Sequence, residues 1–168
     1  MRQILMMRHG YAESISSNGD YFRALTPEGV ALATRAARGL KSIVPNLDAI
    51  YTSPLRRARE TGIIMGSVFG IGEDGVKAAY FLAESNLDDY FQTMARMPTG
   101  AGFLYVGHLP VVHNFVSRAV GKPGLHIAFS PNSVAILSFR ERVAPGKAEL
   151  TGFYTGEELA MLAEQGGN

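Results

Sequence analysis

Two short segments of this sequence carry side chains that can do chemistry together. Arg8, His9 and Gly10 follow an apolar run near the start, and His108 follows a second apolar run much later in the chain. Arginine presents a planar fork of N–H groups that fits phosphate oxygens, and histidine attacks phosphorus when its reacting nitrogen is unprotonated. Glycine lets the backbone turn tightly and lets an anion approach. These residue types predict phosphoryl chemistry centred on His9.

A third segment, residues 53–61, reads Ser-Pro-Leu-Arg-Arg-Ala-Arg-Glu-Thr and places three arginines at the expected start of a helix. The exposed N–H groups and the dipole of a helix favour an anion at its start. A solvated basic helix face would also explain such a cluster, and His108 alone would fit a structural role. Taken together, however, the segments supply the cations that a phosphoryl-transfer transition state requires.

The expected secondary structure brings these segments together. Strands alternate with helices, which predicts an α/β fold: a three-layer α/β/α sandwich with a mostly parallel central sheet. We expect strands at 3–7, 47–52, 77–82, 103–106, 132–139 and 150–154, and helices at 27–43, 53–69, 87–97, 110–120 and 157–165. Ligands of such sheets bind at the carboxyl ends of the strands. Since His9, His108, the 53–61 segment and Glu84 each follow a predicted strand, we expect them at one rim.

Composition narrows the class of protein. A chain of 168 residues fits a single domain over residues 1–168. A net charge of +1 gives no reason to expect a nucleic-acid partner, and the absence of cysteine excludes disulfides and cysteine-based phosphatases. No apolar run approaches the roughly 20 residues of a membrane span. We therefore expect a cytoplasmic protein that starts at Met1 and does not associate with membranes.

Other patterns in the sequence carry less weight. Residues 70–75 read Gly-x-Gly-x-x-Gly, but they follow a predicted helix and contain two carboxylates, so we interpret them as a turn and not a dinucleotide site. Asp88 and Asp89 have no histidine at metal-ligand spacing. We expect neither a metal nor another cofactor, and we expect structural or surface roles for His113 and His126.

The order and spacing of four motifs resemble the histidine phosphatase superfamily, also called phosphoglycerate mutase-like. Within it the chain is most similar to the SixA-type phosphohistidine phosphatases, which are short and have no inserted helical lid. The resemblance covers nearly the whole chain, and its motifs are Arg8-His9-Gly10, Leu25-Thr26-x-x-Gly29, Ser53-Pro54-x-x-Arg57-Ala58-x-x-Thr61 and Gly107-His108-x-Pro110. A further SixA-like feature is Ala12-Glu13 followed by Asp20-x-x-Arg23.

The resemblance implies a role for each matching residue. His9 becomes transiently phosphorylated, while Arg8, Arg57 and His108 hold the phosphoryl oxygens. Arg57 matches the family arginine because it directly precedes an alanine, whereas the arginine before it does not. Arg23 is a further candidate for a substrate or phosphate contact.

Glu84 is the candidate general acid, because larger members of the family place a glutamate after the third strand. It can equally be a helix N-terminal acid. A phosphohistidine phosphatase has less need of such an acid, because an imidazole with a pKa of about 6.5 leaves far more readily than an alcohol.

The nucleophile must be neutral to react. We expect the neighbouring arginines to lower the pKa of His9, and its second ring nitrogen to donate to a backbone carbonyl. His108 can become charged when phosphate is bound, because an anion raises its pKa. On the sequence alone we expect the rate of His9 phosphorylation to change somewhere between about pH 5 and 8.

Three functions are compatible with these residues. The resemblance implies hydrolysis of phosphohistidine on a signalling or phosphotransfer protein, and an open rim would suit a protein surface. The first alternative is a phosphatase of the same superfamily that acts on a small phosphate ester. The second is a non-catalytic phosphate-binding module, since fold alone does not determine function.

Overall fold

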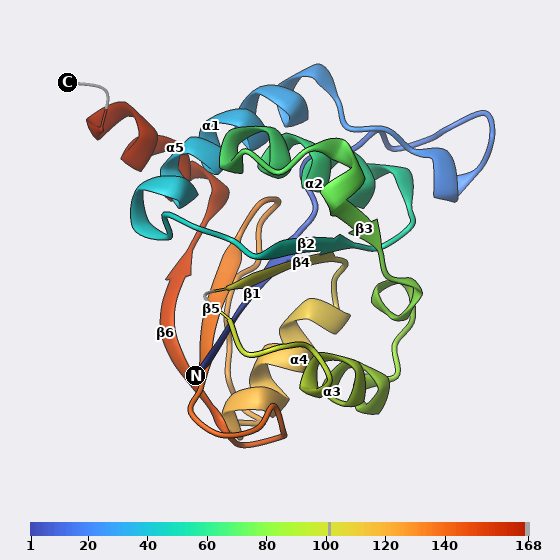
Figure 1. The fold of residues 1–168 in the computed structure, drawn as a ribbon. Helices are drawn as coiled ribbons and strands as arrows, with labels where there is room; N and C mark the ends of the chain where they lie inside the picture. Colours follow the sequence, from blue (N-terminus) through green and yellow to red (C-terminus); the bar gives the residue numbers. More distant parts are fainter. Residues whose placement is uncertain (101, 167–168) are drawn as a thin grey trace.

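A computed structural model describes residues 1–100 and 102–166 of the chain, and within them six strands form one sheet (Figure 1). The strand order is β3-β2-β4-β1-β5-β6. Neighbouring strands are parallel from β3 to β1, and β5 alone runs against the others. This confirms the predicted mostly parallel sheet. The strands are β1 (Arg2–Arg8), β2 (Ala49–Thr52), β3 (Val76–Ala78), β4 (Phe103–Gly107), β5 (Val134–Phe139) and β6 (Ala148–Tyr154).

Helices cover both faces of the sheet and make the predicted three layers (Figure 1). On one face lie α1 (Pro27–Ile43), α2 (Arg56–Phe69) and α5 (Gly156–Gln165), and on the other lie α3 (Leu87–Ala95) and α4 (Val111–Val120). All five α-helices of the described residues pack on the sheet, which leaves none of them to form a lid. In the same part of the chain, no helix combines the length and apolar character that crossing a membrane requires.

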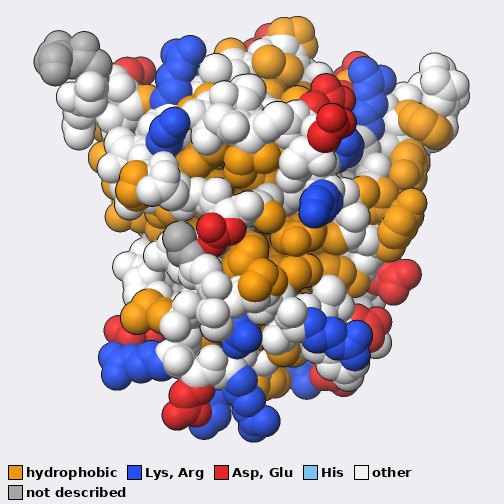
Figure 2. Space-filling model, viewed as in Figure 1, with side chains coloured by type: hydrophobic (Ala, Val, Ile, Leu, Met, Phe, Trp, Pro, Cys, Tyr) orange, Lys and Arg blue, Asp and Glu red, His pale blue; other side chains and the backbone are white. Residues whose placement is uncertain are grey.

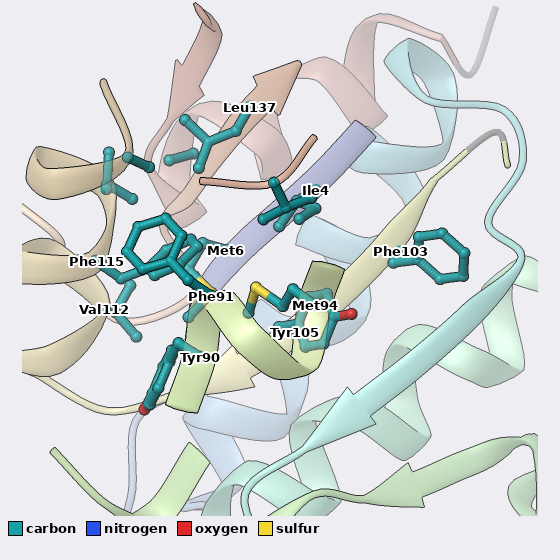
Figure 3. Close-up of a cluster of buried hydrophobic side chains, with 14 of the residues drawn as sticks. Ile4, Met6, Tyr90, Phe91, Met94, Phe103, Tyr105, Val112, Phe115 and Leu137 are labelled. Carbon is teal, nitrogen blue, oxygen red and sulfur yellow. The ribbon is translucent and has the colours of Figure 1, made fainter. Parts of the chain in front are cut away.

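The alternation of side chains along β1 explains why the sheet is covered twice. Ile4 and Met6 join the core cluster formed with α3 and α4, where aromatic residues of both helices surround them (Figure 3). Leu5 and Met7 point to the opposite face and join the cluster formed with α1, α2 and α5. Successive residues of a strand face opposite sides, so a strand apolar at every position must be central.

The helix boundaries follow local chemistry. Thr26 caps α1 by accepting the Gly29 N–H at 2.9 Å, and Pro27 takes the first helical position, as predicted. α2 begins at Arg56 and not at Ser53-Pro54, because these residues form a turn in which Ser53 Oγ accepts the Leu55 N–H at 3.3 Å. The turn predicted at 70–75 is present and ends in the 3₁₀ helix η2 (Glu73–Gly75).

The third strand is shorter than predicted. We expected a strand over 77–82, but β3 ends at Ala78 and the chain continues into the 3₁₀ helix η3 (Tyr80–Ala83). A short apolar run does not distinguish a strand from a helical turn. Here the turn buries Leu82 in the core beneath α3 and leaves Tyr80 exposed, which a continued strand would not do.

Candidate active site

The carboxyl ends of β1, β4 and β2 meet at one rim of the sheet. The register pairs Arg8 with Gly107, so the residues after these strands are neighbours. The His9 N–H donates to the Gly107 carbonyl at 3.1 Å, and the Ser53 N–H donates to the Val106 carbonyl at 2.9 Å. The rings of His9 and His108 consequently lie with their centroids 5.2 Å apart. The two histidines meet as the strand-end rule predicts.

His9 is held in one tautomer by its own backbone. Its Nδ1 lies 2.7 Å from the Gly10 carbonyl oxygen, and because a carbonyl only accepts, Nδ1 carries the proton. The neutral ring therefore presents an unprotonated Nε2. The pKa of His9 is lowered from 6.5 to about 4, and burial is the largest cause. The charges of Arg57, Arg8 and Arg23 also lower this pKa, while the hydrogen bond to Gly10 raises it.

Gly10 lies in a tightly packed turn. Its N–H donates to Thr61 Oγ1 at 3.0 Å, and that hydroxyl donates to the Arg57 carbonyl at 2.7 Å. A Cβ at position 10 would lie 3.1 Å from Asn132 Oδ1 and 3.2 Å from Leu25 Cδ2. A side chain at position 10 would therefore displace these neighbours by a few tenths of an ångström. The N–H of Gly10 ties the His9 turn to α2 and is not a free anion donor.

Arg57 is buried, unlike Arg56 and Arg59 in the same helix. Its Nη1 donates to the Asp20 carbonyl at 2.9 Å, and its Nη2 lies 3.3 Å from Asp20 Oδ2. Arg56 instead pairs with Glu60 at 2.6 Å, largely exposed, and Arg59 donates to the Val76 carbonyl. Of these three arginines, Arg57 is the one whose charge lowers the pKa of both His9 and His108.

Arg8 approaches from the end of β1. Its Nη1 donates to the Phe129 carbonyl at 2.9 Å, and burial lowers its pKa. Among the described residues, Nε of Arg8 and Nε of Arg57 are buried without a hydrogen-bond partner. Unpaired buried donors are costly, so both guanidiniums favour an anion with acceptor oxygens nearby.

Nε2 of His108 is hydrogen-bonded to a serine hydroxyl. The distance from Nε2 to Ser53 Oγ is 2.7 Å. Burial is the largest of the influences that lower the pKa of His108 to about 3, followed by His9 and Arg57, while Asp20 raises it. A bound anion would add a strong opposite charge and raise this pKa. The sequence motif contained Ser53 without a role, and the structure makes it the partner of His108.

Arg23 and Asp20 close the site from the loop before α1. Arg23 Nη1 lies 2.9 Å from Asp20 Oδ1, and its Nε donates to the Glu13 carbonyl. Asp20 therefore sits between Arg23 and Arg57, and the hydrogen bond from Arg23 is the largest cause of its lowered pKa. The structure brings Arg23 close enough to influence His9, but it is Asp20, within the 3₁₀ helix η1 (Asp20–Phe22), that contacts Arg57.

Glu84 differs from these residues because its side chain is exposed and makes no hydrogen bond with any of them. It follows η3, its side chain is exposed, and its backbone carbonyl accepts the Tyr90 hydroxyl at 3.2 Å. Within the described residues, no hydrogen bond or ion pair joins its carboxylate to the histidines or arginines of the rim. The structure thus does not bring the predicted acid into the hydrogen-bonded site.

A model of branch 1 of the histidine phosphatase superfamily matches residues 4–97. The chain belongs to this superfamily. The match includes the turn after β1, the start of α2 and the segment with Glu84, while His108 lies beyond it. A search of curated proteins found no match.

Solved structures of histidine phosphatases have the same fold. A protein from Nakamurella multipartitia, provisionally named phosphohistidine phosphatase SixA, is 26% identical with a TM-score of 0.77, over 91% of this chain and 95% of that one. A protein histidine phosphatase SixA complexed with tungstate is 23% identical with a TM-score of 0.78, over 94% and 99%. A phosphoglycerate mutase from Plasmodium falciparum is 21% identical with a TM-score of 0.65, over 90% and 89%.

This histidine phosphatase contains one buried residue that sequence reasoning assigned only to the start of a strand. Asn132 has a φ of 64°, and in the described part of the chain neither polar atom of its buried side chain has a partner. Its N–H donates to the Arg8 carbonyl at 3.1 Å. Asparagine adopts the left-handed backbone region more readily than most residues. An asparagine after Pro131 was therefore the only local sign in the sequence of this backbone conformation.

The arrangement in this histidine phosphatase can transfer a phosphoryl group. A neutral Nε2 of His9 supplies the electron pair, and two guanidiniums with a second imidazole surround the place where an anion would sit. Among the described residues, no group of three or more His, Cys, Asp and Glu is placed to hold a metal ion. The comparisons support a phosphatase or mutase activity.

We predict that the ring of His9 titrates with a midpoint near pH 4 in the ligand-free protein. A lowered pKa keeps the ring neutral at all higher pH, so the rate of His9 phosphorylation should stay constant from about pH 8 down to about pH 5. The sequence alone predicted a change of rate between about pH 5 and 8. The structure moves this change to lower pH, because burial lowers the pKa of His9 more than the arginines do. NMR titration of the ring would measure the midpoint, and a value near 6.5 would contradict the prediction.

We predict that Arg57→Lys lowers kcat/KM for an aryl phosphate by about a hundredfold, because a lysine lacks the fork of N–H groups that faces the anion. The matched control is Arg56→Lys in the preceding residue, whose exposed ion pair with Glu60 contributes little. Steady-state kinetics of both variants would check the assignment. Equal losses in the two variants would show that Arg57 has no special role.

Proposed function

We propose that this protein is a phosphohistidine phosphatase that removes the phosphoryl group from a histidine of a signalling or phosphotransfer protein through a phosphorylated His9. The observation that carries the proposal is the hydrogen bond of 2.7 Å between His9 Nδ1 and the Gly10 carbonyl oxygen. This bond leaves Nε2 free to act as the nucleophile. The ring of His108, a second neutral imidazole, lies with its centroid 5.2 Å from that of His9.

The first step transfers the phosphoryl group to the enzyme. The bond between phosphorus and the substrate nitrogen breaks, and a bond between phosphorus and His9 Nε2 forms. The substrate imidazole leaves as a neutral ring when its other nitrogen carries a proton, and its pKa of about 6.5 makes it a good leaving group. Arg8, Arg57 and His108 hold the phosphoryl oxygens and balance the charge that spreads over them.

The second step returns the enzyme to its starting state. Water attacks phosphorus, the bond to His9 Nε2 breaks, and inorganic phosphate leaves. His108 is suited to hold the phosphoryl oxygens during this step. The negative phosphoryl group raises the pKa of an adjacent imidazole, and Ser53 is hydrogen-bonded to Nε2 of the ring. Arg23 adds positive charge at the edge of the site and is proposed as a further substrate contact.

The comparisons support this substrate class over others. The structure of 26% identity is provisionally named a phosphohistidine phosphatase, and it matches 91% of this chain. The tungstate complex is named a protein histidine phosphatase. Both names describe those proteins, and this chain adds the exposed position of Glu84, which suits a reaction whose leaving group needs little acid catalysis.

A small phosphate ester is the second candidate substrate. The observation that favours it is a shared fold with a phosphoserine phosphatase mutant from Entamoeba histolytica in complex with phosphoserine, which has a TM-score of 0.64 and 16% identity. An ester releases an alkoxide, which requires a proton at the moment of cleavage. Glu84 is the residue whose substitution separates the two candidates.

We predict that His9 becomes phosphorylated when the protein is mixed with a phosphorylated phosphotransfer domain. Mass spectrometry of the acid-labile phosphoryl group should place it on His9, and His9→Asn should carry none. His126→Asn is the matched control and should keep the label, because His126 is exposed. Loss of phosphate from the donor without a label on wild-type His9 would overturn the proposed intermediate, and an inactive wild type with any aryl phosphate would favour a binding module.

We predict that Glu84→Gln lowers hydrolysis of an alkyl phosphate by about a hundredfold but changes phosphohistidine hydrolysis less than about twofold. The reason is the leaving group, since only the alkoxide needs a strong proton donor. Glu73→Gln, at another exposed glutamate, serves as the control for the loss of a surface charge. Equal losses for both substrates would contradict the proposed preference.

A further inference from the structure

An apolar groove opens beside the cationic site. It encloses about 510 Å³, and no charged side chain lines it; its walls are Leu109, Pro110, Ile127, Ala128 and Phe129, with His113 and Ser130 as polar members. A larger cavity of about 610 Å³ lies at the other end of α4, around Arg118 and Lys122. A helix of this length spans about 15 Å, so only the first groove adjoins the histidines.

The groove and the phosphoryl site are built from the same two segments. Leu109 and Pro110 directly follow His108, and the carbonyl of Phe129 accepts the guanidinium of Arg8 at 2.9 Å. A phosphoryl group held by Arg8 and His108 is therefore at the mouth of the groove. The atoms next to it in the substrate lie within reach of Leu109 or Ile127.

Exposed aromatic residues also lie near the site, outside the groove. Asp20 contacts Arg57, and the next two residues, Tyr21 and Phe22, are 47% and 48% exposed with ring centroids 5.1 Å apart. Tyr80 in η3 is 74% exposed. Figure 2 shows hydrophobic side chains along the right edge of the molecule, where η3 and the loop before α1 lie in Figure 1. Apolar side chains outside the groove thus add to the exposed apolar surface of the molecule.

The chemistry of these walls discriminates between substrates. A polar ester such as a sugar phosphate would place hydroxyl groups against Leu109 and Ile127, where they lose hydrogen bonds to water and gain none. An apolar side chain next to a phosphorylated residue would be removed from water there, which is favourable. A charged side chain would find no partner in the groove.

We infer that the groove binds an apolar side chain adjacent to the phosphorylated residue of a protein substrate. The inference rests on the proposed function, and it assigns the protein two recognition elements. The cations bind the phosphoryl group of any substrate, and the groove selects those in which an apolar residue neighbours it. His113, whose Nε2 accepts the Ile127 N–H at 3.4 Å, holds one wall of the groove in place.

Two short phosphohistidine peptides test this inference directly. They differ only at the residues that flank phosphohistidine, which are leucine in one and serine in the other. The wild type should hydrolyse the leucine peptide with a kcat/KM roughly tenfold higher, as expected for burying one such side chain. The measured quantity is the ratio of the two kcat/KM values.

Charged substitutions in the groove should abolish this preference. In Ala128→Asp the ratio should fall to about one, because a carboxylate repels an apolar side chain from the groove. Ala128 is exposed, so the variant should fold, and Ile127→Asp, at the adjacent lining residue, provides a second test. Met161→Asp, at an exposed apolar residue of α5, is the matched control and should keep the wild-type ratio.

The outcomes separate this inference from the proposed function. Equal hydrolysis of the two peptides by the wild type, or an unchanged ratio in both Ala128→Asp and Ile127→Asp, would overturn the inference and leave the proposed function intact. Hydrolysis of neither peptide, with no label on His9, would overturn both. A preference that is lost in the groove variants and kept in Met161→Asp would support both.

Discussion

The crowding of positive groups in a buried site is the constraint on which the rest of this structure depends. Burial takes the rings of His9 and His108 out of water and is the largest cause that disfavours their charged forms, and the positive charge of Arg57 disfavours those forms further. His9 and His108 give up their protons, which their lowered pKa values near 4 and 3 express. Burial, with these positive charges beside it, thus makes His9 a neutral nucleophile and leaves a place for an anion.

Asp20 is the acid that moderates this charge. Its carboxylate lies near Nη2 of Arg57 and accepts from Arg23, while its carbonyl accepts from Nη1 of Arg57. The carboxylate of Asp20 stays in contact with water, so it balances the charge of the guanidinium without the cost of a fully buried ion pair. The arginine side chain is therefore ordered before a phosphoryl group binds, and a large part of its ordering entropy is already lost.

The sheet supplies the rigid frame that such crowding needs. β1 and β4 are adjacent and central, buried on both faces by two separate apolar clusters. Their ends are joined by the hydrogen bond from the His9 N–H to the Gly107 carbonyl, so the two imidazoles cannot move apart without disturbing the core. The apolar groove beside Arg8 and His108 extends this frame outward and provides the neutral surface that the charged centre lacks.

Features that depend on neighbouring residues are predictable from the amino-acid sequence. The alternation at Ile4 to Met7, the Thr26 cap and the strand-end positions of His9 and His108 are local patterns, and local patterns report side-chain period and backbone preference. Features that depend on long-range packing are not predictable in this way. The contact between Asp20 and Arg57 and the packing of Asn132 beside Gly10 join segments that are distant in the sequence. The early end of β3 and the exposure of Glu84 likewise depend on how distant segments pack. The depth of the pKa shift at His9 belongs with them, because burial is set by every segment that packs around a side chain.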